Sequence, residues 1–146
     1  MIPSLEKSGL LSPGVYYATW HELTERFGIN KHRLSLLDGL KTGLNLLIEY
    51  GCKEACINGS FVTNKVLPAD IDVCYDNTYM KWKKFIKEHP EFVDVKNGPK
   101  IQKQKYGCEF YAYNAFEDDI LRIFQYDRDN NPKGIVKLNF TGTMIS

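Results

Sequence analysis

The chain lacks the features that define several common protein classes. Its 146 residues contain no apolar run long enough to cross a bilayer, and no charged start followed by an apolar segment of signal-peptide length. The net charge is only +1, so the charge of the whole chain does not indicate a nucleic-acid partner. We therefore expect a cytoplasmic protein that does not associate with membranes.

Cysteine is scarce, and its spacing is not that of a metal site. The four cysteines show neither a CxxC pair nor a zinc-like spacing with the three histidines. Because free cysteine commonly behaves as a small core hydrophobe, we interpret them as buried thiols and not as disulfides. All four fall in or beside apolar segments: Cys52, Cys56, Cys74 and Cys108.

Two helices are predicted in the first third of the chain. Thr19 and Glu22 form a capping-box pattern for a short helix that ends at Gly28. Asn30 is a cap residue for a longer helix that ends near Tyr50. Leucines recur at three- and four-residue steps in the second helix and predict one buried stripe: Leu34, Leu37, Leu40, Leu44 and Leu47.

The rest of the chain is predicted to contain one further helix and four short strands. A third helix is expected to bury Tyr79, Trp82, Phe85 and Ile86 before Pro90 interrupts it. The lysine-rich residues 96–105 predict strand ends joined by a basic turn, and residues 120–126 fit a strand or a helix. Strands are predicted at residues 55–57, 70–75, 106–114 and 135–140.

The order of these elements favours one α+β domain over residues 1–146. No internal repeat or long linker divides the chain, and its length is sufficient for one hydrophobic core. About 13 residues at the start are expected to form an extended lead-in.

Two short motifs separated by nine residues carry the most specific chemical signal. In the second motif, Asp70 and Asp72 fall on one side of a predicted strand, because side chains alternate between its faces. Two carboxylates this close require a cation to offset their repulsion, and oxygen ligands suit a hard ion such as Mg²⁺ or Mn²⁺. In the first motif, Gly59 and Ser60 form a small turn whose backbone amides and hydroxyl can approach phosphate oxygens.

The order of strand, Gly-Ser turn, spacer and Asp-hydrophobic-Asp strand resembles the minimal nucleotidyltransferases of the DNA-polymerase-β superfamily. Over the whole chain, residues 9–14 and 132–137 are similar to those of small prokaryotic and phage-borne members of that superfamily. The resemblance implies a mixed β-sheet with helices packed mainly on one face. It also implies two divalent metal ions held by three carboxylates, and transfer of a nucleoside monophosphate from an NTP.

The chain departs from the superfamily pattern in the spacer. The spacer is one residue shorter than in the commonest form, and Val62-Thr63-Asn64-Lys65 replaces the usual small-Arg-Gly stretch after the serine. We therefore expect the loop to be built differently. Lys65 is the expected phosphate contact in the loop, and Lys133 or Lys137 is expected to reach the site from the final strand.

Glu109 is the best positional match for the third carboxylate that the resemblance implies. Asp70, Asp72 and Glu109 would then be both metal ligands and catalytic residues, with Gly59, Ser60 and Lys65 binding the nucleotide. In a second interpretation, Glu109 is a solvent-facing residue on a half-exposed strand. The acidic residues at positions 117–119 are the rival third ligand, although such a run suits a solvated turn.

Three functions remain open at this point. The first is a metal-dependent nucleotidyltransferase whose acceptor is RNA, tRNA or a protein hydroxyl, and the resemblance suggests a toxin, antitoxin or phage-defence setting with a cognate toxin or antitoxin partner. The second is a catalytically silent protein of the same fold that binds a partner. The third is a metal-dependent nuclease, in which the Gly-Ser turn has no required role. Lysines and tyrosines mix over residues 96–113, which suits either a nucleic-acid surface or a basic hairpin with core-facing tyrosines.

Overall fold

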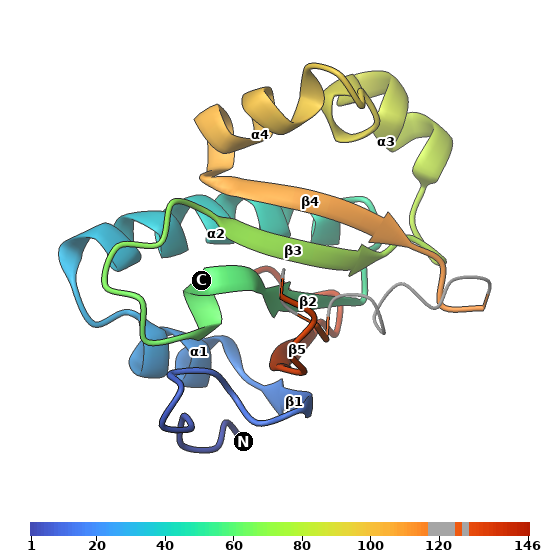
Figure 1. Cartoon of the computed structure of the whole chain (residues 1–146). Coiled ribbons are helices and arrows are strands. Elements are labelled where there is room, and N and C mark those ends of the chain that lie inside the picture. Colours follow the sequence, from blue (N-terminus) through green and yellow to red (C-terminus); the bar gives the residue numbers. More distant parts are fainter. Residues whose placement is uncertain (117–124, 127–128) are drawn as a thin grey trace.

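The computed structural model describes residues 1–116, 125–126 and 129–146. These residues form a five-stranded mixed sheet in the order β1-β5-β2-β3-β4, with helices packed against it (Figure 1). The strands are β1 (Gly14–Ala18), β2 (Glu54–Asn58), β3 (Ile71–Asp76), β4 (Cys108–Tyr113) and β5 (Gly134–Asn139). The helices are α1 (Trp20–Phe27), α2 (Lys31–Glu49), α3 (Trp82–Glu88) and α4 (Gly98–Tyr106), with the 3-10 turns η1 (Gly59–Val62) and η2 (Pro90–Phe92).

Both parallel and antiparallel pairs occur in the sheet. β2 is antiparallel to β3 and β5, whereas β1 pairs in parallel with β5 and β4 pairs in parallel with β3. One face of the sheet shares a single hydrophobic core with side chains from all four helices, among them Leu23, Leu40, Phe85 and Tyr106. The α+β class with helices against one face of a mixed sheet is therefore confirmed.

Local sequence signals explain the first two helices. The Thr19 hydroxyl accepts from the Glu22 amide at 3.1 Å and the Glu22 carboxylate accepts from the Thr19 amide at 3.3 Å, which completes the predicted capping box. The Asn30 side chain accepts from the Arg33 amide at 2.8 Å and begins α2. Leu34 is 49% exposed, however, so its predicted place in the buried stripe is wrong.

The basic turn predicted for residues 96–105 is also wrong, because this segment forms α4. Pro99 is in the first turn of the helix, where a missing amide hydrogen costs nothing. Lysine and glutamine are good helix formers, and Gln102 and Tyr106 are buried four residues apart on one side. Gly107 ends α4 in the left-handed conformation, with φ of 66°.

The third helix begins later than its apolar pattern predicts. The Asp76 carboxylate accepts from the Thr78 amide at 2.9 Å, which holds these residues in a turn. As a result α3 begins at Trp82, and Tyr79 is 55% exposed instead of buried.

Strand β1 was not predicted, because it depends on a partner far along the chain. It follows the lead-in directly and pairs residue for residue with β5, from Gly14 opposite Gly134 to Ala18 opposite Leu138. The predicted strands β2 to β5 and the four buried free cysteines are confirmed. The strand or helix expected at residues 120–126 lies outside the described residues except for 125–126, and so does the acidic run 117–119. Of the helices described, none has the length and apolar character to cross a bilayer.

Two glycines let α2 approach the end of α4 and strand β4. A Cβ atom on Gly39 would stand 2.1 Å from the Tyr106 carbonyl oxygen, and one on Gly43 would stand 2.5 Å from the Phe110 ring. Neither glycine has a positive φ, so close packing and not backbone conformation requires them.

We therefore expect Gly39→Ala to destabilise the protein by about 1–3 kcal/mol, although alanine favours a helix. The reason is that a backbone carbonyl of α4 cannot move away without shifting the helix. Urea unfolding monitored by circular dichroism measures the change. Ser35→Ala, at an exposed position of α2, is the matched control and is expected to leave stability within about 0.5 kcal/mol. An unchanged unfolding free energy for Gly39→Ala would show that α2 and α4 are not in close contact.

Candidate active site

The register of three neighbouring strands aligns the central polar residues of the site. Asp72 of β3 is paired with Asn58 of β2 on one side and with Glu109 of β4 on the other. Side chains of alternate β3 residues, such as Ile71 and Val73, lie in the main core. Asn58, Asp72 and Glu109 therefore project from the opposite face, at one end of the sheet.

Asp70 joins this row from the residue immediately before β3. The ammonium of Lys103, on the last turn of α4, lies 3.1 Å from Asp70 Oδ2 and 3.1 Å from Glu109 Oε1. Both carboxylates are largely shielded, with 21% and 20% of their side-chain surface exposed, whereas Lys103 is 47% exposed. The site thus consists of converging carboxylates bridged by a cation of the protein itself.

No ammonium or guanidinium group of the described residues pairs with Asp72 in this way. Burial and the neighbouring charges of Asp70 and Glu109 raise the pKa of Asp72 to about 6, and Lys133 and Lys103 only partly oppose that effect. For Glu109, burial would raise the pKa, but the hydroxyl of Tyr111 and the ammonium of Lys103 outweigh it and lower the pKa. The Tyr111 hydroxyl donates a short hydrogen bond to Glu109 Oε2. Asp72 is therefore the carboxylate whose negative charge is least well compensated by its surroundings.

Asn58 adds an uncharged oxygen to the same row. Its side chain is 3% exposed, and its Oδ1 atom has no hydrogen-bond partner among the described residues. A buried acceptor without a donor costs about 1–3 kcal/mol unless another group satisfies it. Its place beside Asp72 suits an added cation or a hydrogen-bond donor from a ligand.

Gly59 begins the turn η1 directly against the Asp72 carboxylate. Its φ is +79°, and a Cβ atom there would lie 2.4 Å from Asp72 Oδ2. Only glycine permits this backbone conformation and this approach at the same time. The next residue, Ser60, is partly buried, and its carbonyl accepts the Thr63 hydroxyl at 2.6 Å. The Gly-Ser turn and the carboxylates thus lie together, as the two motifs predicted.

Arg33 of α2 organises the spacer loop that follows this turn. Its fully buried guanidinium donates to the carbonyls of Phe27, Phe61, Thr63 and Lys65. No arginine within the loop is needed for this purpose, which explains how a shortened spacer keeps a defined shape. Lys65 is exposed, and the structure gives its ammonium no contact with the described site residues.

The two other lysines considered from the sequence differ in position. Lys133 lies close enough for its charge to lower the pKa of Asp72. Lys137 instead pairs with Glu54 at 3.0 Å, further along the sheet. Lys133 therefore joins the site and Lys137 does not.

The carboxylate and amide oxygens of the site are suitable ligands for a hard divalent cation. In this structure, however, the ammonium group of Lys103 occupies the space between Asp70 and Glu109. Over residues 1–116, 125–126 and 129–146, no three His, Cys, Asp or Glu side chains stand in an arrangement that could hold a metal ion. The poorly compensated carboxylate of Asp72 and the unsatisfied oxygen of Asn58 favour a cation there. A divalent ion would have to displace Lys103 from Asp70 and Glu109.

Three contributors were missed from the sequence. Asn58 directly precedes the Gly59-Ser60 motif, and the two-residue alternation of β2 would have placed it on the face of Asp72. The same alternation places Tyr111 beside Glu109. Lys103 had no usable signal, because its reach depends on the helix that replaced the predicted basic turn.

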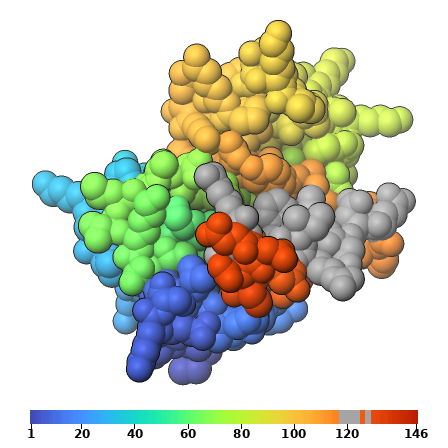
Figure 2. All heavy atoms as spheres, in the orientation of Figure 1, coloured from blue at the N-terminus to red at the C-terminus, as the bar shows by residue number. Residues whose placement is uncertain are grey.

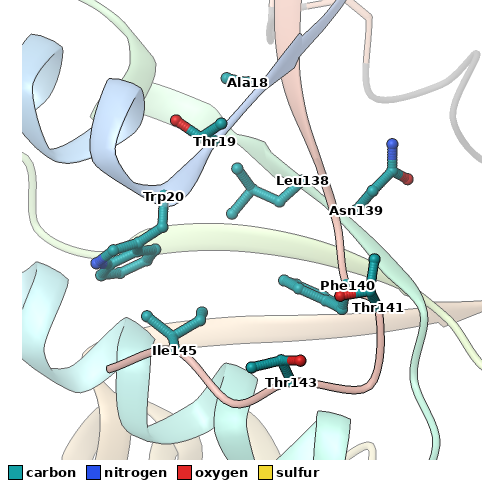
Figure 3. Close-up of a pocket in the computed structure, with 9 residues that line it drawn as sticks. All are labelled: Ala18, Thr19, Trp20, Leu138, Asn139, Phe140, Thr141, Thr143 and Ile145. Carbon is teal, nitrogen blue, oxygen red and sulfur yellow. The ribbon is translucent and has the colours of Figure 1, made fainter.

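The pocket in Figure 3 is at the other end of the strands. It lies beside Ala18 of β1 and Leu138 of β5, with Trp20 and Ile145 among its apolar walls (Figure 3). Asn45 fixes the chain near its end through hydrogen bonds of 2.9 and 2.7 Å with the backbone of Ile145. This pocket is therefore separate from the row of carboxylates.

The substitution Asp72→Asn is expected to stabilise the protein at pH 8. The folded-state pKa of Asp72 is about 6, above the ordinary value of 3.8, so ionisation of Asp72 opposes folding. Its contribution to stability is full below pH 3.8 and is lost as the pH rises through about 6. The difference corresponds to about 3 kcal/mol, and we expect asparagine to recover about 1–3 kcal/mol at pH 8.

Urea unfolding of both proteins at pH 4 and pH 8 measures this difference. The gain should be small at pH 4, where wild-type Asp72 is largely protonated. Asp38→Asn, an exposed change on α2, provides the control and should show no comparable gain. A gain that is the same at both pH values would contradict the assignment of the effect to Asp72 ionisation.

Comparison with known proteins identifies the chain at the family level. Searches of curated proteins and of solved structures each gave no match. Residues 3–139 match a family of unknown function, DUF6932, which covers nearly the whole chain. The chain therefore belongs to the DUF6932 family.

Proposed function

We propose that the protein is a metal-dependent nucleotidyltransferase with a polymerase-β-like fold. In this proposal it transfers a nucleoside monophosphate from an NTP to a hydroxyl of a macromolecular acceptor. The observation that carries the proposal is the convergence of Asp70, Asp72 and Glu109 beside the Gly59 turn. A phosphate-approaching turn packed against carboxylates is the combination that transfer of a phosphoryl group from a triphosphate requires.

The carboxylates of Asp70, Asp72 and Glu109 would hold Mg²⁺ or Mn²⁺. The bound ion would neutralise phosphate charge and lower the pKa of the acceptor hydroxyl. Gly59 and Ser60 would contact phosphate oxygens through the backbone amides of η1 and the serine hydroxyl. Glu109 would accept the proton as the acceptor oxygen bonds to the α-phosphorus and pyrophosphate leaves.

Lys103 would change partners during this cycle. Its side chain is long and about half exposed, so its ammonium can leave Asp70 and Glu109 without disturbing α4. Once released, the ammonium would remain near the phosphates and balance their charge. Lys133, whose charge already acts on Asp72, would contribute to the same field. Lys65 would act only through the loop that Arg33 holds.

A catalytically silent protein that binds a partner is the second candidate. The observation that favours it is the Lys103 bridge, since an ammonium group there satisfies two of the three carboxylates without a metal. A nuclease is the third candidate, but nuclease activity does not require Gly59 to pack closely against Asp72. A role in a toxin-antitoxin system or in phage defence is suggested by the resemblance alone.

The experiment is a transfer assay with α-labelled nucleoside triphosphates, Mg²⁺ or Mn²⁺, and total RNA or protein as acceptor. We expect the wild type to label an acceptor and the double variant Asp70→Asn, Asp72→Asn to lose at least about 100-fold of the rate, because both changes remove charge from the proposed ligand set. Asp38→Asn serves as the matched control and should retain activity.

Equal labelling by the wild type and the double variant would refute the proposal. Absence of both labelling and triphosphate binding would favour the silent protein. Shortening of RNA or DNA that needs metal but no triphosphate would favour the nuclease.

A further inference from the structure

Positive charge is concentrated in one helical segment of an otherwise acidic chain. Residues 81–105 contain eight lysines and three acidic residues, a net charge of +5 in a protein whose total is +1. This segment includes α3, η2 and α4, which lie together above strand β4 in Figure 1. The remainder of the chain therefore carries a net charge of −4, so the basic character is local.

The acidic residues of the segment are already engaged. Glu88 accepts the Tyr50 hydroxyl at 3.0 Å, and the buried Glu91 pairs with Lys105 at 3.3 Å. The Asp94 carboxylate accepts hydrogen bonds from the amides of Lys96 and Asn97 at 3.0 Å each. These carboxylates leave most of the lysine charge unbalanced.

Six of the lysines are exposed, and no described carboxylate lies within 4 Å of their ammonium groups. They are Lys81, Lys83, Lys84, Lys87, Lys96 and Lys100. Long side chains of this segment project into solvent at the top of the molecule in Figure 2. Keeping several like charges together costs free energy unless an external polyanion balances them.

Helical periodicity places three of these residues away from the core, and the exposed Lys96 precedes α4. In α3, Lys83 and Lys87 are one turn apart and opposite the buried Phe85. In α4, Lys100 is opposite the face that carries the buried Gln102, and Lys96 is exposed in the turn that leads into α4. We name Lys83, Lys87, Lys96 and Lys100 the lysine surface.

The α4 end of the lysine surface leads toward the carboxylates. Lys103 follows Lys100 by one turn of α4, and its ammonium contacts both Asp70 and Glu109. A chain of phosphates that follows α4 would thus arrive at the carboxylate site. In the same region Tyr106 and Tyr113 are buried, and the Tyr111 hydroxyl is engaged by Glu109, so none of the three stands out as a free stacking platform. Contacts would therefore be to the phosphate backbone and not to the bases.

We propose that the lysine surface binds the phosphate backbone of a nucleic acid, which is the acceptor in the transfer reaction. The role as acceptor rests on the proposed function, whereas the binding itself does not. Uniform contacts to phosphates predict little dependence on sequence and a strong dependence on salt.

Fluorescence anisotropy with labelled single-stranded RNA and DNA of about 20 nucleotides tests the binding. The triple variant Lys83→Gln, Lys87→Gln, Lys100→Gln removes part of the lysine surface. The control variant Lys7→Gln, Lys31→Gln, Lys41→Gln removes the same charge from the lead-in and α2. All six positions are outside the main hydrophobic core, and matching thermal unfolding midpoints of the two variants establish that each is folded.

We expect the wild type to bind at least one of the two nucleic acids. The triple variant should bind about tenfold more weakly and the control variant less than about twofold more weakly. The slope of log affinity against log salt should fall by about 0.7 for each phosphate that the triple variant no longer neutralises. Equal weakening in both variants would contradict the proposal that the lysine surface binds nucleic acid. Competition by polyglutamate as strong as that by nucleic acid would contradict it too.

The transfer assay separates the two proposals. Binding that depends on the lysine surface, with no transfer to any acceptor, would refute the proposed transferase activity and support nucleic-acid binding by the lysine surface. Transfer to protein without binding of RNA or DNA would support the proposed transferase activity and refute nucleic-acid binding by the lysine surface. Transfer to nucleic acid that the triple variant loses, and the control variant keeps, would support both.

Discussion

The pairing of β2, β3 and β4 in one register is the constraint on which the site depends. It aligns Asn58, Asp72 and Glu109 across three strands, and a shift of one residue in any strand would turn its polar residue into the main core. The buried residues between them hold that register, since Ile57 and Val73 are fully inaccessible to solvent. The hydrophobic core thus specifies the site, because the same alternation that buries one set of side chains projects the other.

This alignment has an electrostatic consequence. Carboxylates that the sheet forces together cannot separate, so their repulsion must be offset by a cation or by protonation. Lys103 bridges Asp70 and Glu109, and the repulsion that remains raises the pKa of Asp72 to about 6. Such an arrangement opposes stability, which is common where function requires concentrated charge. Lys103 of α4 places the opposite charge beside these carboxylates.

The sequence predicts elements whose determinants are local. Capping residues such as Thr19 and Asn30 and the alternation around Asp72 predicted α1, α2 and β3, because each signal acts within a few residues. Strand β1 could not be predicted from such signals, since its partner β5 lies more than 100 residues away. In the site, strand alternation predicted that Asp70 and Asp72 share a face, but Lys103 was missed because Pro99 was interpreted as part of a turn instead of a helix start.

The central claim is that the carboxylate row takes up a divalent cation in place of Lys103. Its most direct test is the affinity of the protein for Mn²⁺, measured from the electron paramagnetic resonance signal of the free ion. We predict specific binding that strengthens as the pH rises through about 6, where Asp72 loses its proton, and that weakens by at least about tenfold in Asp72→Asn. Equal affinity of the wild type and Asp72→Asn at pH 8, or no specific binding by the wild type, would contradict the account.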